Sequence, residues 1–314
     1  MRVFIVRHGE SEANEKSEAY PKGKRYLYDQ AIAPNYLTYK GILQAKTAGR
    51  SFAEFWQRER QGGEARKLQV IYSPVKRAQQ TMDFFLGENK DLKLAAEKNG
   101  LHGDWRIAEQ QDGGYAAVHD LRDQMLAKGT WVASHPDMDR HGNPATPLSE
   151  GDKVYLEATK VHVNPDNPAE AWPAGDWYNA KPPKGESAKE MLVRVREFVE
   201  EKLAGGGDED VVLFSHSGTA AALKIALETC HLPPEEKRDR SLINTAVPPG
   251  NAEIMMFETD AQGHFVQKPF DSKAQTVTDD DAAKFRKEDQ ARRPGMRVNE
   301  PRRILLDRAE GFSR

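Results

Sequence analysis

Three short hydrophobic runs, far apart in the chain, are each followed by a polar segment and then by a helical pattern. The runs are rich in β-branched residues and comprise Arg2–Val6, Leu68–Tyr72 and Val211–Phe214. Strands that alternate with helices in this way build a mostly parallel sheet with helices on both of its faces. The chain is therefore predicted to be an α/β protein, a three-layer α/β/α sandwich with a mostly parallel central sheet.

Apolar residues at three- and four-residue spacing predict the helices between these runs. The predicted helices cover Gly41–Glu59, Ser73 to about Leu86, Glu186–Leu203 and Gly218–Thr229. Ser73 is the expected N-cap of the second helix, with Pro74 at its first position. Near the end of the alternating region, Ile254–Phe257 and Phe265–Gln267 predict a hairpin.

Two segments depart from the alternating pattern. Residues 115–184 contain three of the five tryptophans and many prolines, which predicts an inserted cap whose aromatic side chains pack against something. From Ser272 onward the chain is charged and poor in apolar residues until Ile304. We therefore expect a catalytic domain over residues 1–271, with the cap at about 115–184, and a peripheral or partly disordered tail over 272–314.

The overall charge argues against some classes of partner. A net charge of −3, with 30% charged residues, gives no general attraction to nucleic acid or to an anionic membrane. No stretch approaches 18 apolar residues. We expect no secretory signal peptide, because the first residues form a strand-like run that leads directly into Arg7-His8. The single cysteine, Cys230, cannot form an internal disulfide. We expect a cytoplasmic protein.

The first strand leads directly into Arg7-His8-Gly9. Open α/β sheets place their sites at the carboxyl ends of the strands. A histidine attacks phosphorus when one ring nitrogen is free and the other is fixed by a hydrogen bond. The neighbouring arginine carries a permanently charged, planar group that matches phosphate oxygens. The tripeptide therefore suggests a phosphoryl site at His8.

The other two strands end in residues of the same kind. Ser73-Pro74-Val75-Lys76-Arg77 follows the second strand, and Ser215-His216-Ser217-Gly218 follows the third. Two arginines, two histidines and a helix N-terminus at one edge of a sheet form a strong site for a dianion. The three segments together predict a phosphate-binding centre.

In these motifs and their order the sequence resembles the histidine phosphatase superfamily, also called phosphoglycerate-mutase-like, of the branch 1 type. The similarity extends from Arg2 to about Phe257. Its further motif residues are Asn14, Leu37-Thr38 with Gly41, Gln44 and Ala45, the run Ser73 to Thr81, Glu109 with Gly113-Gly114, and Gly185-Glu186-Ser187.

The resemblance implies a role for each matching residue. His8 is the nucleophile that becomes phosphorylated, Arg7 and Arg77 clamp the phosphoryl oxygens, and Asn14 and His216 donate hydrogen bonds to them. Glu109 is the general acid, and afterwards the base that activates water. No metal or other cofactor is implied, because the arginines supply the positive charge.

Two alternatives concern the site. Asp112, Glu10 and Glu186 also lie near motif positions, although Glu10 and Glu186 suit hydrogen bonding to arginines and loop amides better. His135, Asp137, Asp139 and His141 alternate along the chain, so on an extended segment they share a face that could bind a metal. Pro136 and Gly142 make a polar surface loop the favoured interpretation.

The favoured activity is hydrolysis of a phosphomonoester of a small metabolite. Ala13 and Ser217-Gly218 stand where glycolytic mutases carry other residues, whereas the length of the cap resembles theirs. A phosphoglycerate-type phosphomutase is thus the runner-up. A catalytically inactive phosphate-binding or scaffold protein is the alternative of another class. The expected partner is a phosphorylated small molecule, selected by the cap, whose Lys181 and Lys184 suit an anionic group. The sequence indicates neither the substrate nor the oligomeric state.

Overall fold

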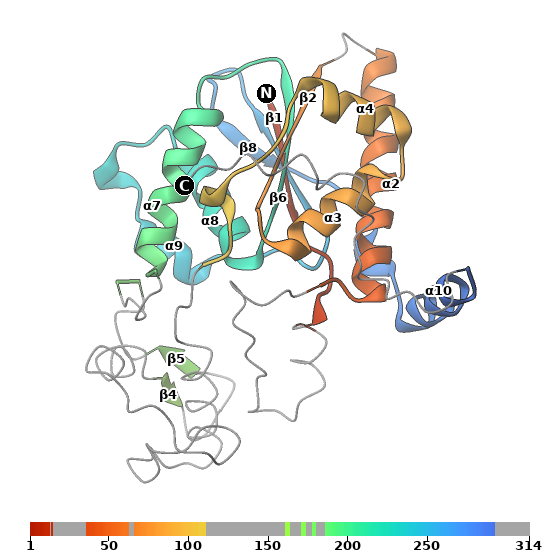
Figure 1. The fold of residues 1–314 in the computed structure, drawn as a ribbon. Helices are drawn as coiled ribbons and strands as arrows, with labels where there is room; N and C mark the ends of the chain where they lie inside the picture. The colour runs from red at the N-terminus through yellow and green to blue at the C-terminus, as the bar shows by residue number, and fades with distance from the viewer. Residues whose placement is uncertain are drawn as a thin grey trace.

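The computed structural model describes residues 1–12, 14, 36–62, 66–110, 161–163, 171–173, 178–179 and 186–292. Its centre is a six-stranded sheet with the strand order β3-β2-β6-β1-β7-β8 (Figure 1). The strands are β1 (Arg2–Arg7), β2 (Lys67–Tyr72), β3 (Leu101–Gly103), β6 (Glu209–Ser215), β7 (Ile254–Thr259) and β8 (Phe265–Lys268). The first four named are mutually parallel, whereas β7 is antiparallel to β1, and β8 is antiparallel to β7. The predicted α/β fold and hairpin are confirmed.

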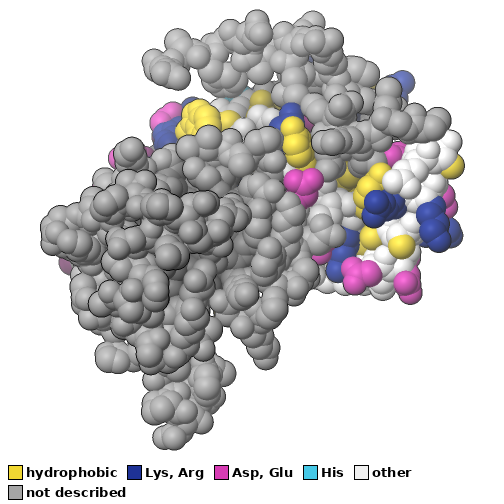
Figure 2. Space-filling model, turned by 60° about the horizontal axis from the view of Figure 1, so that its bottom comes forward, with side chains coloured by type: hydrophobic (Ala, Val, Ile, Leu, Met, Phe, Trp, Pro, Cys, Tyr) yellow, Lys and Arg dark blue, Asp and Glu magenta, His cyan; other side chains and the backbone are white. Residues whose placement is uncertain are grey.

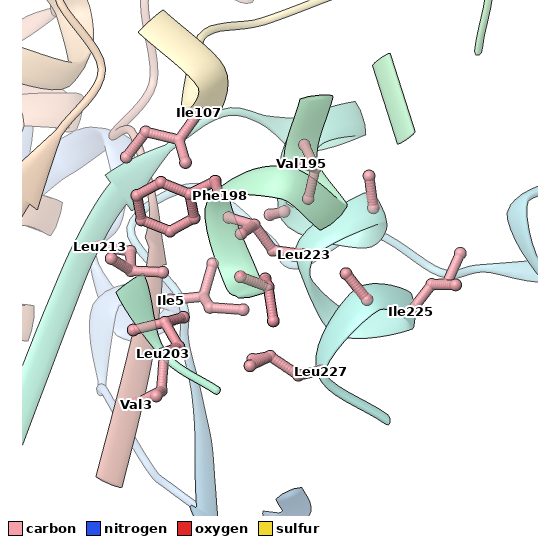
Figure 3. Close-up of a cluster of buried hydrophobic side chains, with 14 of the residues drawn as sticks. Val3, Ile5, Ile107, Val195, Phe198, Leu203, Leu213, Leu223, Ile225 and Leu227 are labelled. Atoms are coloured by element: carbon pink, nitrogen blue, oxygen red, sulfur yellow. The ribbon is translucent and has the colours of Figure 1, made fainter. Parts of the chain in front are cut away.

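One face of the sheet is covered by α7 (Ala188–Lys202) and α8 (Ser217–Thr229). Val3 and Ile5 point to this face, because side chains alternate along a strand. They meet Phe198 of α7 and Leu223 of α8, and all four side chains are buried (Figure 3). Ser187 and Glu190 form a reciprocal capping box that starts α7.

The opposite face is covered by α2 (Tyr39–Gly62), α3 (Lys76–Leu86) and α4 (Lys90–Asn99). Phe4 and Val6, the alternate residues of β1, pack there against Phe52 and Phe85. The rings of Phe4 and Phe52 meet edge to face, with centroids 4.9 Å apart. Two hydrophobic cores therefore hold the sheet on both sides, as the continuous apolar strands predict.

The register of the parallel strands aligns their carboxyl ends. Arg7 of β1 pairs with Ser215 of β6, and Phe214 pairs with Tyr72 of β2. The residues that follow stay bonded across the sheet, since His8 N donates to Ser215 O at 2.9 Å. Ser73 N likewise donates to Phe214 O at 2.8 Å. The three predicted site segments therefore begin side by side.

The predicted start of the helix after β2 is wrong. Helix α3 begins at Lys76, its N-cap is Val75, and Val75 makes no capping bond through its side chain. The hydroxyl of Ser73 contacts Nε2 of His216 instead, at 2.7 Å. Ser73 also precedes a proline, which disfavours helical backbone at that residue. The hydroxyl that resembles a cap in the sequence belongs to the site.

Several further elements were not predicted. They are α4, β3, a 3-10 turn at Trp105–Ile107, and the short helix α9 (Asp239–Thr245). Helix α10 (Asp279–Arg292) has no buried residue and lies against α2, where the rings of Phe285 and Tyr39 are 5.9 Å apart. On the right of Figure 2, the side where α10 lies in Figure 1, side chains of both charge signs are interspersed.

Most of the predicted cap lies outside the described residues. Within it, β4 (Val161–Val163) and β5 (Ala171–Pro173) form an antiparallel pair. The division into a catalytic domain, a cap and a tail stays a prediction. Among the helices that the structure describes, none is long and apolar enough to cross a membrane.

Candidate active site

His8 follows the last residue of β1 and is 4% exposed. Its Nδ1 lies 2.7 Å from the carbonyl oxygen of Gly9. A carbonyl oxygen only accepts hydrogen bonds, so this contact assigns the ring hydrogen to Nδ1. Nε2 of the neutral ring then carries a lone pair, which is the state that a nitrogen nucleophile needs.

Arg77 is held against that nitrogen by the first turn of α3. Its Nε donates to Nε2 of His8 over 3.0 Å, and the residue is 1% exposed. Thr81, one turn further along α3, accepts from Gly9 N at 3.1 Å and donates to Arg77 O at 2.8 Å. The threonine therefore fixes the loop of His8 to the helix that carries Arg77.

His216 occupies the N-cap position of α8, and its ring centroid is 5.2 Å from that of His8. Its Nε2 is 2.7 Å from Ser73 Oγ. Its Nδ1 is buried and has no hydrogen-bond partner among the described residues. A buried ring nitrogen of this kind is costly unless something binds it, which indicates a site for a ligand.

Burial is the main reason why the pKa of His8 and the pKa of His216 lie well below the ordinary range for histidine. The nearby positive charge of Arg77 lowers the pKa of both histidines further, as does that of Arg7. Both rings are therefore neutral near pH 7. The positive charge of the site comes from the two arginines.

Arg7 approaches the same histidines from the end of β1. Its Nη1 donates to Pro249 O at 2.9 Å, while its buried Nε has no partner among the described residues. Burial lowers the pKa of Arg7, and the carboxylates of Glu109 and Glu253 oppose that shift. Arginine stays charged at any working pH, so Arg7 is a fixed cation with a free donor.

Glu109 lies against the first turn of α8. Its Oε1 accepts from the backbone N–H of Gln110 at 3.1 Å and lies 3.4 Å from Thr219 Oγ1. A Cβ on Gly218 would come within 3.2 Å of the same oxygen, so glycine gives the carboxylate room at this turn. Glu109 is thus close to the segment that carries His216, and its charge acts on Arg7.

Asn14 is partly buried. Its Oδ1 accepts from the backbone N–H of Ser11 at 3.0 Å and from the Ser11 hydroxyl at 2.9 Å. The carbonyl side of the amide is therefore engaged in its own loop. The role predicted for Asn14 requires its amide nitrogen.

The alternative carboxylates have other contacts. Glu10 is buried, accepts from Thr38 Oγ1 at 2.7 Å and lies 3.6 Å from Lys40 Nζ. Glu186 forms a two-point ion pair with Arg194. Both contacts agree with the hydrogen-bonding interpretation of these two carboxylates. Asp112 lies outside the described residues.

A family model for the histidine phosphatase superfamily, branch 1, matches residues 156–272, which include β6, His216 and all of α8. Over this stretch the chain is similar to the histidine phosphatase superfamily. An adenosylcobalamin/alpha-ribazole phosphatase from Salmonella typhimurium is 25% identical to it over 231 residues, which are 73% of this chain and 80% of that protein.

Several solved structures share the fold of this chain. An alpha-ribazole phosphatase from Shigella flexneri superposes with a TM-score of 0.53 at 19% identity, covering 87% of this chain and 97% of that chain. The product of an open reading frame of Mycobacterium tuberculosis gives a TM-score of 0.50 at 17% identity, covering 86% and 96%. At these identities the similarity establishes the fold alone.

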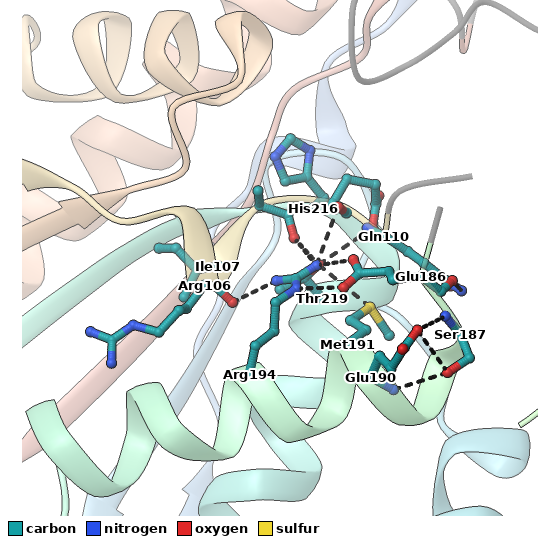
Figure 4. Close-up of polar contacts among 12 residues, drawn as sticks. Arg106, Ile107, Gln110, Glu186, Ser187, Glu190, Met191, Arg194, His216 and Thr219 are labelled. Carbon is teal, nitrogen blue, oxygen red and sulfur yellow. Dashed lines mark hydrogen bonds and ion pairs between the residues drawn. The ribbon is translucent and has the colours of Figure 1, made fainter. Parts of the chain in front are cut away.

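Two residues of the chain lie at the site and were not predicted there. Ser73 was interpreted as a helix cap, although its hydroxyl contacts His216. Arg194 is one of several charged residues on α7, and its guanidinium bonds the segment that ends in Glu109 (Figure 4). Its sequence signal is the four-residue spacing of Glu190 and Arg194, which places these two on one side of the predicted helix.

The candidate metal ligands from His135 to His141 lie outside the described residues. Within the part of the chain that the structure describes, no group of three or more His, Cys, Asp or Glu side chains is arranged to hold a metal ion. The absence of a metal requirement stays a prediction.

Proposed function

We propose that the protein is a phosphatase that hydrolyses a phosphomonoester of a small metabolite through a phosphohistidine at His8. The observation that carries this proposal is the state of the His8 ring. Nδ1 is bound to Gly9 O, and the lone pair of Nε2 faces the guanidinium of Arg77. This is a nitrogen nucleophile beside a cation that attracts phosphate.

In the first step, the Nε2 lone pair of His8 attacks phosphorus and the bond from phosphorus to the ester oxygen breaks. Glu109, protonated, gives its proton to the leaving oxygen. Arg7 and Arg77 carry two positive charges, which match the dianionic phosphoryl group. Their donors stabilise the charge on its equatorial oxygens, as phosphoryl transfer requires. Asn14 supplies a further neutral donor.

We propose that His216 also donates a hydrogen bond to a phosphoryl oxygen. Ser73 would select the tautomer of the His216 ring. Ser73 Oγ accepts from Val75 N at 3.3 Å, so its own hydrogen can point to Nε2 of His216. In that tautomer Nδ1 carries the ring hydrogen. Because Nδ1 is buried without a partner among the described residues, a phosphoryl oxygen is a suitable acceptor.

In the second step, the carboxylate of Glu109 takes a proton from water as the water oxygen attacks phosphorus. The P–N bond breaks, inorganic phosphate leaves, and His8 returns to its neutral state. Neither step consumes a cofactor. A mutase would instead return the phosphoryl group to the bound product and keep water out.

The names of the similar proteins favour hydrolysis over the mutase and over an inactive protein. The Salmonella and Shigella relatives are both named phosphatases, and alpha-ribazole appears in both names. A screen of phosphorylated metabolites for phosphate release should therefore include alpha-ribazole 5′-phosphate. A 3-phosphoglycerate mutase assay in parallel distinguishes the runner-up activity. Release of phosphate from none of the compounds would favour the inactive alternative.

The role of Glu109 is tested by how strongly the rate loss in Glu109→Gln depends on the leaving group. An alkoxide is a poor leaving group and needs the proton, whereas p-nitrophenolate does not. We expect Glu109→Gln to slow phosphorylation by an alkyl phosphate at least about a hundredfold, and by p-nitrophenyl phosphate only a few fold. Single-turnover kinetics measure this step.

Glu258→Gln is the matched control for this experiment. Glu258 of β7 lies opposite Arg2 in the sheet register, at the end of β1 that is far from His8. We expect it to leave both rates unchanged. Equal losses on both substrates in Glu109→Gln would remove Glu109 from the proposed chemistry. Asp112 would then be the next carboxylate to test.

A further inference from the structure

Arg194 lies on α7 and directs its guanidinium at the segment that ends in Glu109 (Figure 4). Nη1 donates to Arg106 O at 2.6 Å. Nη2 donates to Ala108 O at 2.9 Å and to Glu109 O at 3.3 Å. A single side chain therefore binds three backbone carbonyls within four residues, the last of them that of Glu109 itself.

The same guanidinium is anchored by Glu186. Nε of Arg194 donates to Glu186 Oε2 at 2.9 Å, and Nη2 contacts Oε1 at 2.5 Å. Only about a fifth of either side chain is exposed, which makes this two-point pair more rigid than a surface ion pair. Gln110 Nε2 also donates to Glu186 O at 3.1 Å. Arg194 thus ties the two ends of the stretch from Glu109 to Glu186 together.

Side chains of β6 and α8 hold the rest of the segment. Ser215 Oγ donates to Ile107 O at 2.8 Å, and Thr219 Oγ1 donates to Ala108 O at 2.7 Å. With the three bonds from Arg194, every carbonyl from residue 106 to residue 109 is held by a side chain. Such complete fixation leaves the Glu109 backbone little freedom to shift relative to α8.

We propose that Arg194, anchored by Glu186, is a positioning residue for Glu109: it fixes the backbone from which the general acid reaches the leaving oxygen. The inference rests on the proposed function, because it needs Glu109 to act as the acid. Proton transfer depends on hydrogen-bond geometry, and a misplacement of about 1 Å can cost about a hundredfold in rate.

A different role for Arg194 is purely electrostatic. Its positive charge contributes to the lowered pKa of His216, after burial and the charge of Arg77. Arg194→Lys separates the two roles. Lysine keeps the charge, but its single ammonium cannot reproduce a planar fork that bonds three carbonyls and a carboxylate. Under the positioning role, Arg194→Lys and Arg194→Gln are expected to behave alike.

The experiment measures single-turnover phosphorylation with an alkyl phosphate and with p-nitrophenyl phosphate. We expect Arg194→Gln and Arg194→Lys to slow the alkyl reaction about tenfold to a hundredfold, and the aryl reaction by less than about threefold, since that leaving group needs little acid. Combining Arg194→Gln with Glu109→Gln should add little to the loss from Glu109→Gln alone, because residues that act as a unit are not additive.

Arg196→Gln is the matched control. Arg196 lies on the same helix and is also held at two points by a carboxylate, that of Asp239, with a further bond to Thr229 Oγ1 at 2.9 Å. It does not bond residues 106–109. We expect its replacement to affect both substrates equally. Circular dichroism and the thermal midpoint of each variant report whether it is folded.

Glu186→Gln is the second variant, in case replacement of Arg194 prevents folding. It retains the arginine and its carbonyl bonds but weakens the anchor. We therefore expect a smaller loss of phosphorylation rate, which is again larger with the alkyl phosphate than with the aryl phosphate. Equal losses on both substrates in folded Arg194→Lys or Glu186→Gln overturn the inference. If Glu109→Gln slows the alkyl reaction more than the aryl reaction and the Arg194 variants slow both equally, only the inference about Arg194 fails. If Glu109→Gln itself slows both reactions equally, the proposed role of Glu109 fails as well.

Discussion

Nε of Arg77 and Nε2 of His8 are joined by a hydrogen bond of 3.0 Å in which the arginine donates. The bond keeps a lone pair on Nε2 and places a permanent cation beside it. Together with burial, that cation holds the pKa of His8 well below its ordinary range. A phosphoryl group that approaches Nε2 replaces this bond and finds the guanidinium already next to its oxygens. In the mechanism we propose, Arg77 thus prepares the nucleophile before substrate arrives.

The tautomer of His216 is tested by Ser73→Ala. Without the hydroxyl, neither ring nitrogen is fixed, and the hydrogen proposed to face the phosphoryl group is no longer held on Nδ1. We expect kcat/KM to fall about tenfold, the equivalent of about 1.4 kcal/mol. Ser272→Ala is the control, since Ser272 is also buried and its hydroxyl oxygen accepts from Ala274 N and does not contact a histidine. Equal effects of both changes would argue against the role of Ser73.

Close backbone packing at Gly41 holds the loop of His8. A Cβ on Gly41 would come within 2.0 Å of Glu10 O, and one on Gly9 within 2.4 Å of Gly41 O. Gly41 lies in helix α2, where alanine is intrinsically preferred by about 1 kcal/mol. We nevertheless expect Gly41→Ala to lower the free energy of unfolding by at least about 2 kcal/mol, because backbone must move.

Chemical denaturation of Gly41→Ala measures this loss, and activity should fall with it as the His8 loop shifts. Gly205→Ala is the comparison, since a Cβ there meets nothing within 4 Å. We expect Gly205→Ala to leave the free energy of unfolding and the activity unchanged. If Gly41→Ala were as stable and as active as the wild type, the tight packing described here would be wrong.

Asp83 gives a pH dependence of stability. Burial raises its pKa to about 6, against the opposing charges of Lys76 and Lys93. Because the unfolded carboxyl ionises near pH 3.9, stability is lost as the pH rises from about 4 through about 6. Asp83→Asn should therefore stabilise the protein at pH 7.5 by on the order of 1–2 kcal/mol and do nothing at pH 4.

Thermal unfolding of Asp83→Asn at the two pH values measures this difference. Asp208→Asn, a change at an exposed carboxylate that pairs with Arg66, should have little effect at either pH. If Asp83→Asn increased the stability by the same amount at pH 4 and at pH 7.5, this would contradict the raised pKa of Asp83.

Metal chelation should leave turnover unchanged. Arg7 and Arg77 already supply two positive charges at the site, so the proposed steps need none from a cation. Activity measured after dialysis against EDTA checks this. Loss of activity that one particular divalent metal restores would contradict it, and would direct attention to the segment from His135 to His141.

Contiguous signals in the sequence predicted the sheet and the central site residues. Strands β1, β2 and β6 each have a run of apolar residues, and Arg7, His8, Arg77 and His216 lie at the ends of these strands or within the next turn. Parallel strands align their carboxyl ends, so adjacency in space followed from the fold class. The same reasoning predicted both helical layers.

The residues that were missed interact across long sequence separations. Ser73 and His216 are 143 positions apart, and a serine before a proline looks the same in a cap and in a site. Arg194 reaches carbonyls 85 to 88 positions away, and backbone acceptors leave no signature in a sequence. Helix α4 did carry a local signal, because Asn89 caps Leu92 N, yet its charged surface obscured the pattern.

The proposed phosphohistidine is tested most directly by trapping it. Wild-type protein is mixed briefly with ³²P-labelled substrate, quenched without acid, and digested for mass spectrometry, alongside His8→Ala and the control His102→Ala from β3. We expect about one acid-labile phosphoryl group per chain on His8. It should be present in His102→Ala and absent, together with turnover, in His8→Ala. Label on another residue, or turnover of His8→Ala at a comparable rate, would contradict covalent catalysis by His8.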